Sequence, residues 1–220
     1  MKFESLLLIE DYSPHAAGIQ MAIDQALLEQ TSGPILRIYR WATPCVTIGY
    51  FERLQTAQED FPGLEITRRW TGGGSVAHGS DWPYSLIIPR SHVFSKIRPA
   101  ESYQIIHTAL AAVLATPLKN VELATRDSSK VSAACFENPV QFDILRSGEK
   151  IAGAGQRRSR VGLLHQGSLQ LHPESHPQAK DFANTLADFI EPIGLSAEIL
   201  HAAKEIADAR YNNPHWLRSR

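Results

Sequence analysis

Cysteine is scarce in this sequence, which has two among its 220 residues, Cys45 and Cys135. Two cysteines are too few to form a disulfide framework in a chain of this length. A small disulfide-bonded secreted scaffold is therefore excluded, and a reducing, cytoplasmic setting is expected. An excess of charge of one sign is also lacking, because 22 basic and 23 acidic residues give a net charge of −1. Bulk attraction to nucleic acid or another polyanion is not expected.

Long hydrophobic runs are absent as well. The apolar run near the N-terminus covers only residues 6–9, and Glu10 and Asp11 follow it directly. Such a run is too short for a signal peptide or a membrane span, so we expect no membrane partner. No internal repeat or low-complexity segment interrupts the chain. With 43% hydrophobic and 20% charged residues, the sequence predicts one globular domain over residues 1–220.

The hydrophobic pattern predicts helices and strands in an irregular order. Apolar residues recur at helical spacing in residues 14–29, 101–115, 177–190 and 196–209. Short β-rich runs predict strands at residues 4–10, 34–41, 46–51, 65–70, 84–90, 121–125, 141–146, 149–154 and 163–171. The dipeptide Ser147-Gly148 is expected to form a hairpin turn. Because strands and helices do not alternate regularly, the predicted fold class is α+β, with a mixed, largely antiparallel sheet flanked by helices.

The first candidate motif is a glycine-rich segment, residues 68–78, which reads RRWTGGGSVAH. Three consecutive glycines remove every side chain from a short piece of backbone, so a ligand can lie directly on the peptide groups. The two arginines before them supply planar cations that suit a carboxylate, phosphate or carbonyl oxygen. The alternative is a plain hairpin turn with solvated arginines, since such short motifs match by chance.

The second candidate motif surrounds Lys150, which opens a strand beside small residues. A ligand can approach this lysine closely, and if it is desolvated it can take part in proton transfer. The alternative is a hairpin-end lysine in water. His78 and His165 are each either acid–base groups or polar filling residues, and the sequence alone leaves both interpretations open.

The third candidate is Cys135, which lies in a loop of small residues bounded by Pro139. Lys150 follows fifteen residues later, and a nearby cation lowers the pKa of a thiol and favours the nucleophilic thiolate. Cys45 differs in its setting, because it adjoins an apolar run, and we expect it to be a small buried residue.

Taken together, the three motifs resemble the lipoate–protein ligase and octanoyltransferase family, which is distantly related to biotin–protein ligases. The pattern Arg-Arg-x-Thr-Gly-Gly-Gly-x-Val-x-His matches at residues 68–78, and Gly-x-Lys-Ile-x-Gly matches at residues 148–153. Residues 21–28 and 47–51 also look like that family. The resemblance covers roughly residues 5–172, the expected core, with C-terminal helices over residues 177–209. It implies a mixed sheet that wraps an acyl-binding tunnel.

The resemblance also implies the residues of the site. Cys135 and Lys150 are the expected catalytic residues, and no metal ligand is expected. The expected substrate-binding residues are Arg68, Arg69, Gly72, Gly73, Gly74, His78, Gly153, Gly155, Gln156, His165 and Gly167. One departure concerns the His-Gly motif of many relatives, in which histidine directly precedes glycine. Here Gln166 holds that place and His165 lies one residue earlier, which weakens the role carried over to His165.

Two chemistries belong to this family. Its ligases activate free lipoate with ATP and Mg²⁺ and often need an accessory domain or subunit, for which this chain has no room. Its transferases need no cofactor and move an octanoyl group from acyl carrier protein through a cysteine thioester. The loop around Cys135 resembles that of the transferases, so the expected function is octanoyl, or lipoyl, transfer in protein lipoylation. The expected acceptors are lipoyl domains of 2-oxoacid dehydrogenases or glycine-cleavage H protein. The alternatives are an ATP-dependent lipoate–protein ligase and a non-catalytic protein that binds lipoyl domains or acyl carriers.

Overall fold

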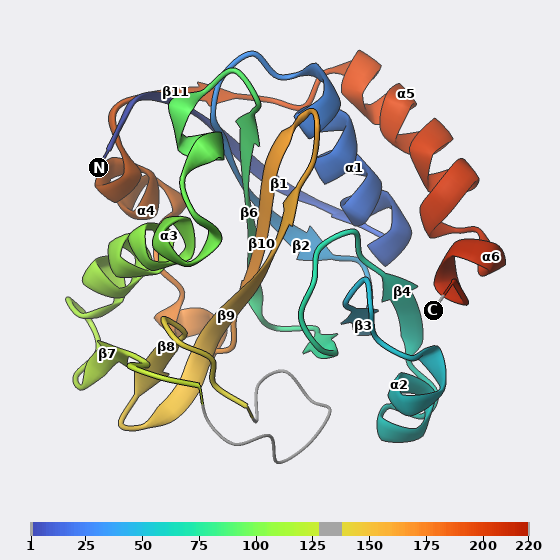
Figure 1. Cartoon of the computed structure of the whole chain (residues 1–220), viewed down its shortest axis with the longest axis horizontal. Helices are drawn as coiled ribbons and strands as arrows, with labels where there is room; N and C mark the ends of the chain where they lie inside the picture. The colour runs from blue at the N-terminus through green and yellow to red at the C-terminus, as the bar shows by residue number, and fades with distance from the viewer. Residues whose placement is uncertain (1, 128–137, 220) are drawn as a thin grey trace.

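The computed structural model describes residues 2–127 and 138–219. An eight-stranded sheet runs through its centre in the order β11-β1-β2-β6-β10-β9-β8-β7, and a smaller sheet has the order β4-β3-β5 (Figure 1). The strands of the large sheet are β1 (Phe3–His15), β2 (Ile35–Trp41), β6 (Trp82–Pro89), β7 (Val121–Leu123), β8 (Ile144–Arg146), β9 (Glu149–Arg158), β10 (Gly162–Leu169) and β11 (Ala187–Ile193). Those of the small sheet are β3 (Cys45–Ile48), β4 (Glu65–Arg68) and β5 (Val76–His78).

The large sheet is mixed and mainly antiparallel. Strand β1 pairs in parallel with β2 and β11, whereas the other neighbouring strands run antiparallel. The predicted fold class is therefore confirmed. The predicted turn is confirmed as well, because Ser147 and Gly148 have φ angles of 52° and 85° between β8 and β9. Two successive positive φ angles are typical of the tight turns that join two-stranded hairpins.

Helices cover both faces of the large sheet (Figure 1). The described residues form α1 (Ala17–Gln30), α2 (Leu54–Asp60), α3 (Pro99–Leu114), α4 (Ala179–Leu186), α5 (Ala197–Ile206) and α6 (Pro214–Leu217). Helix α2 packs on β3 of the small sheet rather than on the large sheet. The core on one face includes residues of α3 and α4, and the core on the other face includes residues of α1 and α5. Within the part of the chain that the structure describes, no helix is long and apolar enough to cross a membrane.

Several predicted boundaries are wrong. The strands predicted at 141–146 and 65–70 are shorter, at Ile144–Arg146 and Glu65–Arg68, and the strand predicted at 149–154 continues to Arg158. The first helix begins at Ala17 rather than Pro14, because β1 continues to His15 and pairs there with Trp41 of β2. Residues 187–190, predicted as helix, belong to β11, whose parallel pairing with the edge of β1 overrides the local helical pattern. Residues 49–51, predicted as the end of a strand, lie beyond β3. The sequence pattern also missed α2 and β5.

Helix α1 is buried on nearly every side, because α5 packs on the face that the sheet leaves open. Its polar residues are therefore buried too, whereas the sequence predicted an ordinary amphipathic helix. Asp24 of α1 accepts a hydrogen bond from Arg37 of β2 at 2.9 Å, and Asp11 of β1 accepts another from it at 2.6 Å. Buried charges of opposite sign must be paired, so this cluster fixes α1 on the sheet.

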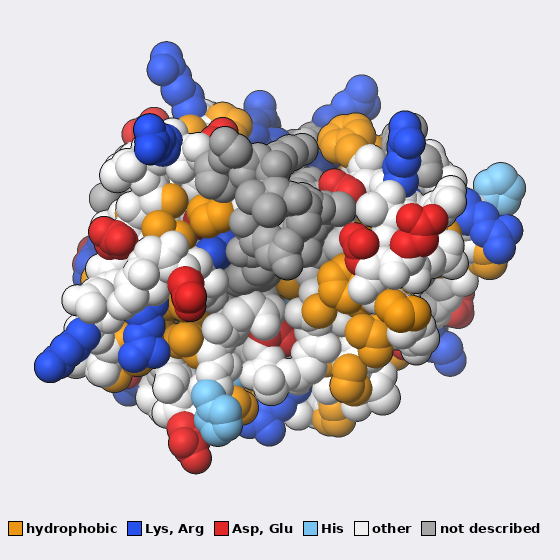
Figure 2. Space-filling model, turned by 90° about the horizontal axis from the view of Figure 1, so that it is seen from below, with side chains coloured by type: hydrophobic (Ala, Val, Ile, Leu, Met, Phe, Trp, Pro, Cys, Tyr) orange, Lys and Arg blue, Asp and Glu red, His pale blue; other side chains and the backbone are white. Residues whose placement is uncertain are grey.

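The face shown in Figure 2 has no large patch of charged side chains of one sign. Basic and acidic side chains are interspersed there, with hydrophobic side chains between them. This distribution agrees with the net charge of −1.

Candidate active site

The glycine loop, residues 69–75, connects β4 to β5 and is held from within by Arg69. The Arg69 guanidinium donates hydrogen bonds to the carbonyl oxygens of Thr47 at 2.9 Å, Gly72 at 2.8 Å and Gly74 at 2.7 Å. A single planar cation that binds three carbonyls fixes the path of a segment whose glycines supply no anchoring side chains. Arg69 itself is buried.

Arg68 ties the small sheet to the C-terminal helix. Its guanidinium is fully buried and donates hydrogen bonds to four main-chain carbonyl oxygens. Their distances from the nearest guanidinium nitrogen are 3.1 Å for Gly49, 3.0 Å for Tyr50, 2.7 Å for Glu52 and 2.8 Å for Leu217. The structure thus gives this arginine a role in holding loops. Its substrate-binding role stays a prediction.

The glycine loop lies directly against two other parts of the backbone. A Cβ atom on Gly155 of β9 would lie 2.4 Å from the carbonyl oxygen of Gly72, and one on Gly49 would lie 1.8 Å from that of Gly73. Both distances are below any real contact, so only glycine allows this approach. Gly73 also has a φ of 92°, which glycine adopts without strain. The loop therefore packs directly on the backbone of β9 and of the segment after β3.

A β-bulge places Lys150 on the same face of β9 as Gly153. Leu145 of β8 pairs with Lys150, but Ile144 pairs with Ala152, so β9 has one residue more than β8 at this point. In a regular strand, residues 150 and 153 point to opposite faces. The extra residue in the bulge shifts the alternation of side chains by one position, so Lys150 and Gly153 share a face. The Nζ atom of Lys150 lies 2.8 Å from the position that a Cβ on Gly153 would take.

The Lys150 ammonium is buried in an ion pair with Asp143. Its Nζ lies 2.8 Å from Oδ2 of Asp143, and the two side chains are 1% and 0% exposed. The other carboxylate oxygen accepts a hydrogen bond from the Tyr103 hydroxyl at 2.5 Å, and the Val140 amide donates to Oδ2 at 2.8 Å. Burial and the Asp143 carboxylate raise the pKa of Tyr103 well above its usual value, so that this hydroxyl stays protonated. The carboxylate is fully hydrogen-bonded, as a buried charge requires.

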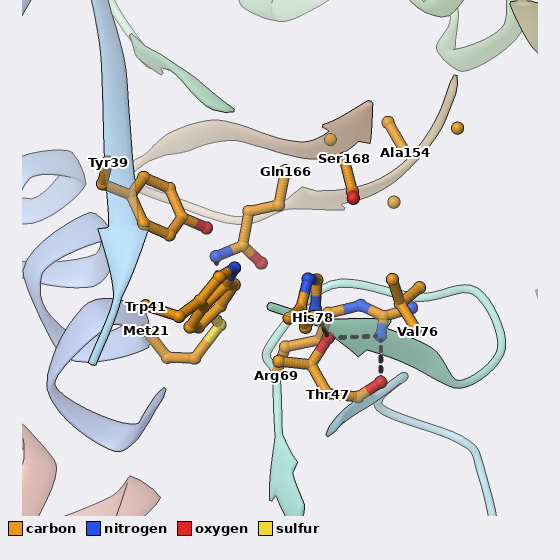
Figure 3. A pocket seen from close by; sticks show the side chains of 13 residues that line it. Met21, Tyr39, Trp41, Thr47, Arg69, Val76, His78, Ala154, Gln166 and Ser168 are labelled. Atoms are coloured by element: carbon orange, nitrogen blue, oxygen red, sulfur yellow. Dashed lines mark hydrogen bonds between the residues drawn. The ribbon is translucent and has the colours of Figure 1, made fainter. Parts of the chain in front are cut away.

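Next to Gly153 lies a narrow cavity, here called the central cavity (Figure 3). Its free space is about 30 Å³, so a ligand larger than a few water molecules has to widen it. Side chains from α1, β2, β3, β5 and β10, together with the backbone of β9, form its walls. They belong to Met21, Tyr39, Trp41, Thr47, Arg69, Val76, His78, Gly153, Ala154, Gly155, Gln166, Gly167 and Ser168. The mixture of aromatic, aliphatic and backbone surface with a few polar groups suits an apolar chain.

His78 is held at the wall of the central cavity through both ring nitrogens. Its Nδ1 lies 2.7 Å from Oδ2 of Asp81, and its Nε2 lies 2.8 Å from the Thr47 hydroxyl. The Ser168 hydroxyl also donates to Asp81 at 2.6 Å. Burial alone raises a carboxyl pKa, but the charge of His78 and the hydrogen bonds to the carboxylate outweigh it, so the pKa of Asp81 is lowered. The arrangement fixes the ring of His78 in one orientation.

Gln166 links the glycine loop to α1. Its amide oxygen accepts a hydrogen bond from the Thr71 hydroxyl at 2.8 Å, and its amide nitrogen donates to Asp24 at 2.7 Å. Asp24 also binds Arg37. A residue that the sequence identified only as a departure from the His-Gly motif thus connects the loop to the buried ionic cluster under the cavity.

Comparison with known proteins agrees with this geometry. Residues 16–192 match the family model described as the lipoyl protein ligase A/B catalytic domain. The chain belongs to this family.

The relatives and solved structures extend the comparison. The chain is 37% identical over 173 residues to octanoyltransferase LipM of Oceanobacillus iheyensis and 33% identical over 177 residues to that of Geobacillus kaustophilus. These matches cover 72% and 73% of the chain and 62% and 63% of the relatives. The chain thus spans about three fifths of the length of these curated relatives.

A structure of lipoate–protein ligase A bound with ATP superposes with a TM-score of 0.71 at 20% identity, over 99% of both chains. A bipartite ligase with its E2 lipoyl domain from Thermoplasma acidophilum gives a TM-score of 0.64 at 18% identity, over 99% of this chain and 97% of that one. At these identities the structures show a shared fold.

The structure brings together many of the residues that the family resemblance singled out. Arg69, His78, Gly153, Gly155 and Gly167 line the central cavity, and Lys150 lies against Gly153. Gly72, Gly73 and Gly74 belong to the glycine loop and do not line the cavity themselves. The substrate-binding roles of these residues stay predictions.

Gln156 and His165, which belong to the predicted set, lie on the opposite face of the sheet from the central cavity. The ring of His165 is buried on the α3 face of the sheet, near Tyr84 and 3.1 Å from the Gln156 amide. Neither residue lines the central cavity, because side chains alternate between the faces of a strand and the neighbouring Gln166 takes the cavity side. Burial lowers the pKa of His165 well below its usual value, so this ring is neutral.

Buried histidines on the α3 face make the stability of the fold depend on pH. Burial lowers the pKa of His107 to about 4 from an ordinary 6.5. As the pH falls from about 6.5 to 4, the unfolded chain binds a proton there that the folded protein does not, so stability is lost. We expect His107 to account for about 3 kcal/mol of this loss. Urea unfolding at pH 7 and pH 4 measures it. His107→Gln should reduce the dependence, and an unchanged pH dependence in that variant would contradict the assignment.

The two cysteines differ in what the structure describes. Cys45 is buried in β3, and burial raises the pKa of its thiol to about 12, so the prediction of a small buried residue is confirmed. Cys135 lies outside the described residues, and its catalytic role stays a prediction. Among residues 2–127 and 138–219, no three His, Cys, Asp or Glu side chains lie together as a metal site.

Sequence reasoning missed Asp143 as the partner of Lys150, although a signal was present. In a hairpin with Ser147-Gly148 at its turn, Lys150 pairs with Leu145, and Asp143 lies two residues before Leu145, directly ahead of β8. Residues two apart across a strand pair are diagonal neighbours within reach of long side chains. The hairpin and an acidic residue at that distance therefore predict an ion pair.

Proposed function

We propose that this chain transfers an octanoyl group from an acyl carrier protein to a lysine of a lipoyl domain or H protein, through a thioester on Cys135. The observation that carries the proposal is the buried Lys150–Asp143 pair, which lies against Gly153 at the wall of the central cavity. A buried ammonium beside an apolar cavity suits chemistry at the head of an acyl chain. Relatives at 30–37% identity that are named octanoyltransferase support the same reaction.

In the first step, the Cys135 thiolate attacks the carbonyl carbon of the octanoyl thioester. The new carbon–sulfur bond replaces the bond to the carrier's thiol, which leaves as a thiolate and takes up a proton. The Lys150 ammonium favours the attacking thiolate, because a neighbouring cation lowers a thiol pKa. Val140, five residues after Cys135 in the sequence, donates to the Asp143 carboxylate that pairs with Lys150. The Lys150–Asp143 pair is thus bonded to a residue that is close to Cys135 in the sequence, which supports the proposed role of the pair.

In the second step, the neutral amine of the acceptor lysine attacks the Cys135 thioester. An amide bond forms, the bond to the Cys135 sulfur breaks, and the surplus proton on nitrogen passes to that sulfur with Lys150 as the relay. The central cavity, widened by the ligand, holds the octanoyl chain throughout, and burial keeps water away from the thioester. No cofactor takes part in this scheme, whereas the alternative ligase reaction needs ATP and Mg²⁺.

The proposal is tested by supplying the two donors separately. One mixture contains the protein, octanoyl-acyl carrier protein and a lipoyl domain without ATP, and the other contains free octanoate or lipoate with ATP and Mg²⁺. We expect mass spectrometry to show octanoylation of the lipoyl domain in the first mixture. Modification in the second mixture alone would identify a ligase. Binding of the carrier without modification in either mixture would identify a non-catalytic binding protein.

A further inference from the structure

Arg157 of β9 lies beside the glycine loop and forms no hydrogen bond or ion pair with the described part of the chain. Its Nε atom is buried without a hydrogen-bond partner there. Arg68 and Arg69 differ, because both already bind several main-chain carbonyl oxygens. Buried donors are ordinarily paired, so the unused donors of Arg157 point to a ligand that brings its own acceptor.

Two aromatic rings hold the Arg157 guanidinium in place. Its central carbon lies 5.1 Å from the centre of the Tyr50 ring and 5.3 Å from that of the Trp70 ring. The Tyr50 amide donates a hydrogen bond to the Thr71 carbonyl oxygen at 2.9 Å, which ties this ring to the glycine loop. A cation–π contact uses the face of the guanidinium and none of its N–H groups. The group is therefore oriented while its planar fork stays available for an anion.

Arg157 shares a face of β9 with the glycines of the site. Residues 152–158 pair one to one with β10, so residues 153, 155 and 157 project from the same face. Gly153 and Gly155 place no side chain there, and the Lys150 ammonium lies against Gly153. The rise of a strand puts Gly153 and Arg157 about 13 Å apart. Strand β9 therefore carries two cations on one face, with glycine backbone and the glycine loop between them.

The glycine loop leaves room for a slender ligand between these two cations. A Cβ atom on Gly72 would meet nothing within 4 Å, and Gly73 is exposed. The Gly72 amide lies 3.5 Å from the carbonyl oxygen of Gln156, which places the loop directly next to Arg157. Arg157 does not line the central cavity. A ligand bound to it therefore keeps one end outside the cavity and extends along the loop toward Lys150.

We propose that Arg157 binds the phosphate of a pantetheine arm that delivers the octanoyl thioester. The inference rests on the proposed function, which supplies the thioester. About thirteen bonds separate the sulfur of such an arm from its phosphorus, which corresponds to about 15 Å of extended chain. A phosphate at Arg157 thus places the thioester beside Gly153 and Lys150. A guanidinium suits this anion because its N–H fork matches two phosphate oxygens.

Two donors that differ only in the phosphate test the site. We expect the unaltered protein to use octanoyl-phosphopantetheine with a kcat/KM at least about tenfold above that for octanoyl-pantetheine, because the second donor lacks the charge-assisted contact. In Arg157→Gln the two donors should react with nearly equal kcat/KM. Arg157→Gln breaks no hydrogen bond of the described residues, so we expect this variant to fold.

Arg210→Gln is the matched control, because it removes the same charge from the same surface. Arg210 also lies over the Trp70 ring, at 5.1 Å, but it donates a hydrogen bond to Gln25 at 2.7 Å. This variant should keep the preference for the phosphorylated donor. An equal loss of preference in both variants would show a general attraction of anions to a basic surface and would overturn the inference. A folded Arg157→Gln protein that keeps the preference would also overturn it.

Octanoyl-acyl carrier protein and octanoyl-coenzyme A both carry this phosphate. Arg157→Gln should therefore lower kcat/KM with each of them, and the better donor for the unaltered protein is the source of the arm. Calorimetry with phosphopantetheine and pantetheine, which carry no acyl group, separates this inference from the proposed function. Binding of phosphopantetheine that is at least about tenfold tighter, and only when Arg157 is present, supports the site even if no transfer occurs. Equal binding of the two compounds, or no binding of phosphopantetheine, contradicts it.

Discussion

Replacing Lys150 with methionine is expected to abolish measurable octanoyl transfer and also to destabilise the fold. Methionine keeps the length of the side chain but removes the ammonium that pairs with Asp143 at 2.8 Å. Loss of a positioned acid–base group costs about 10²–10⁴-fold in rate. The remaining carboxylate is 0% exposed, and an unpaired buried charge costs about 3–5 kcal/mol. Transfer assays and urea unfolding measure the two effects.

A double variant separates the two effects of Lys150→Met. Asp143→Asn removes the buried charge that Lys150→Met leaves unpaired. The amide oxygen of the asparagine can still accept the hydrogen bond from the Tyr103 hydroxyl. Lys150→Met combined with Asp143→Asn should therefore recover most of the lost stability and none of the transfer activity. If the double variant regained activity together with stability, Lys150 would be a structural residue and the proposed chemistry would be wrong.

Gly155→Ala should displace the glycine loop. The new Cβ would lie 2.4 Å from the carbonyl oxygen of Gly72 and 3.2 Å from the Thr71 hydroxyl, so the backbone of the loop must move. Overpacking of this kind costs about 1–3 kcal/mol. Because Gly155 lines the central cavity, we expect transfer activity to fall as well. Thermal unfolding and the transfer assay measure both changes.

Gly72→Ala is the matched control for stability, because it adds the same methyl group to the loop residue that Gly155 contacts, but outside that contact. Nothing lies within 4 Å of a Cβ at Gly72, so this variant should unfold at nearly the temperature of the unaltered protein. Equal destabilisation by Gly72→Ala and Gly155→Ala would show that the loop does not pack on β9 as described.

Most of the fold could be predicted from local patterns, and the errors have a common cause. The hairpin at Ser147-Gly148 and the helix over residues 101–115 depend on short-range signals, and both are confirmed within a few residues. Residues 187–190 of β11 were predicted as helix because the strand that pairs with them, β1, is distant in the sequence: Phe3 pairs with Ala187, 184 residues later. Such a contact leaves no mark in a local window of sequence.

Site residues that belong to a sequence motif could be predicted. Site residues that only the arrangement of the strands brings together could not. The glycine motif led directly to Arg69 and His78 at the central cavity. Tyr39 and Trp41 escaped notice, because an aromatic pair at alternating positions of a strand looks like ordinary core. The burial of Lys150 depends on one extra residue in β9, and a β-bulge has no reliable sequence signal of its own.

The central claim is a thioester on Cys135, and the most direct test is to trap it. The protein is mixed with octanoyl-acyl carrier protein without ATP or acceptor, then digested, and its peptides are weighed by mass spectrometry. We predict one octanoyl group on the peptide that contains Cys135. The adduct should be absent in Cys135→Ser and retained in Cys45→Ser, because the Cys45 thiol is buried with a pKa of about 12. Octanoylation of a lipoyl domain by the Cys135→Ser protein at an undiminished rate would contradict the account.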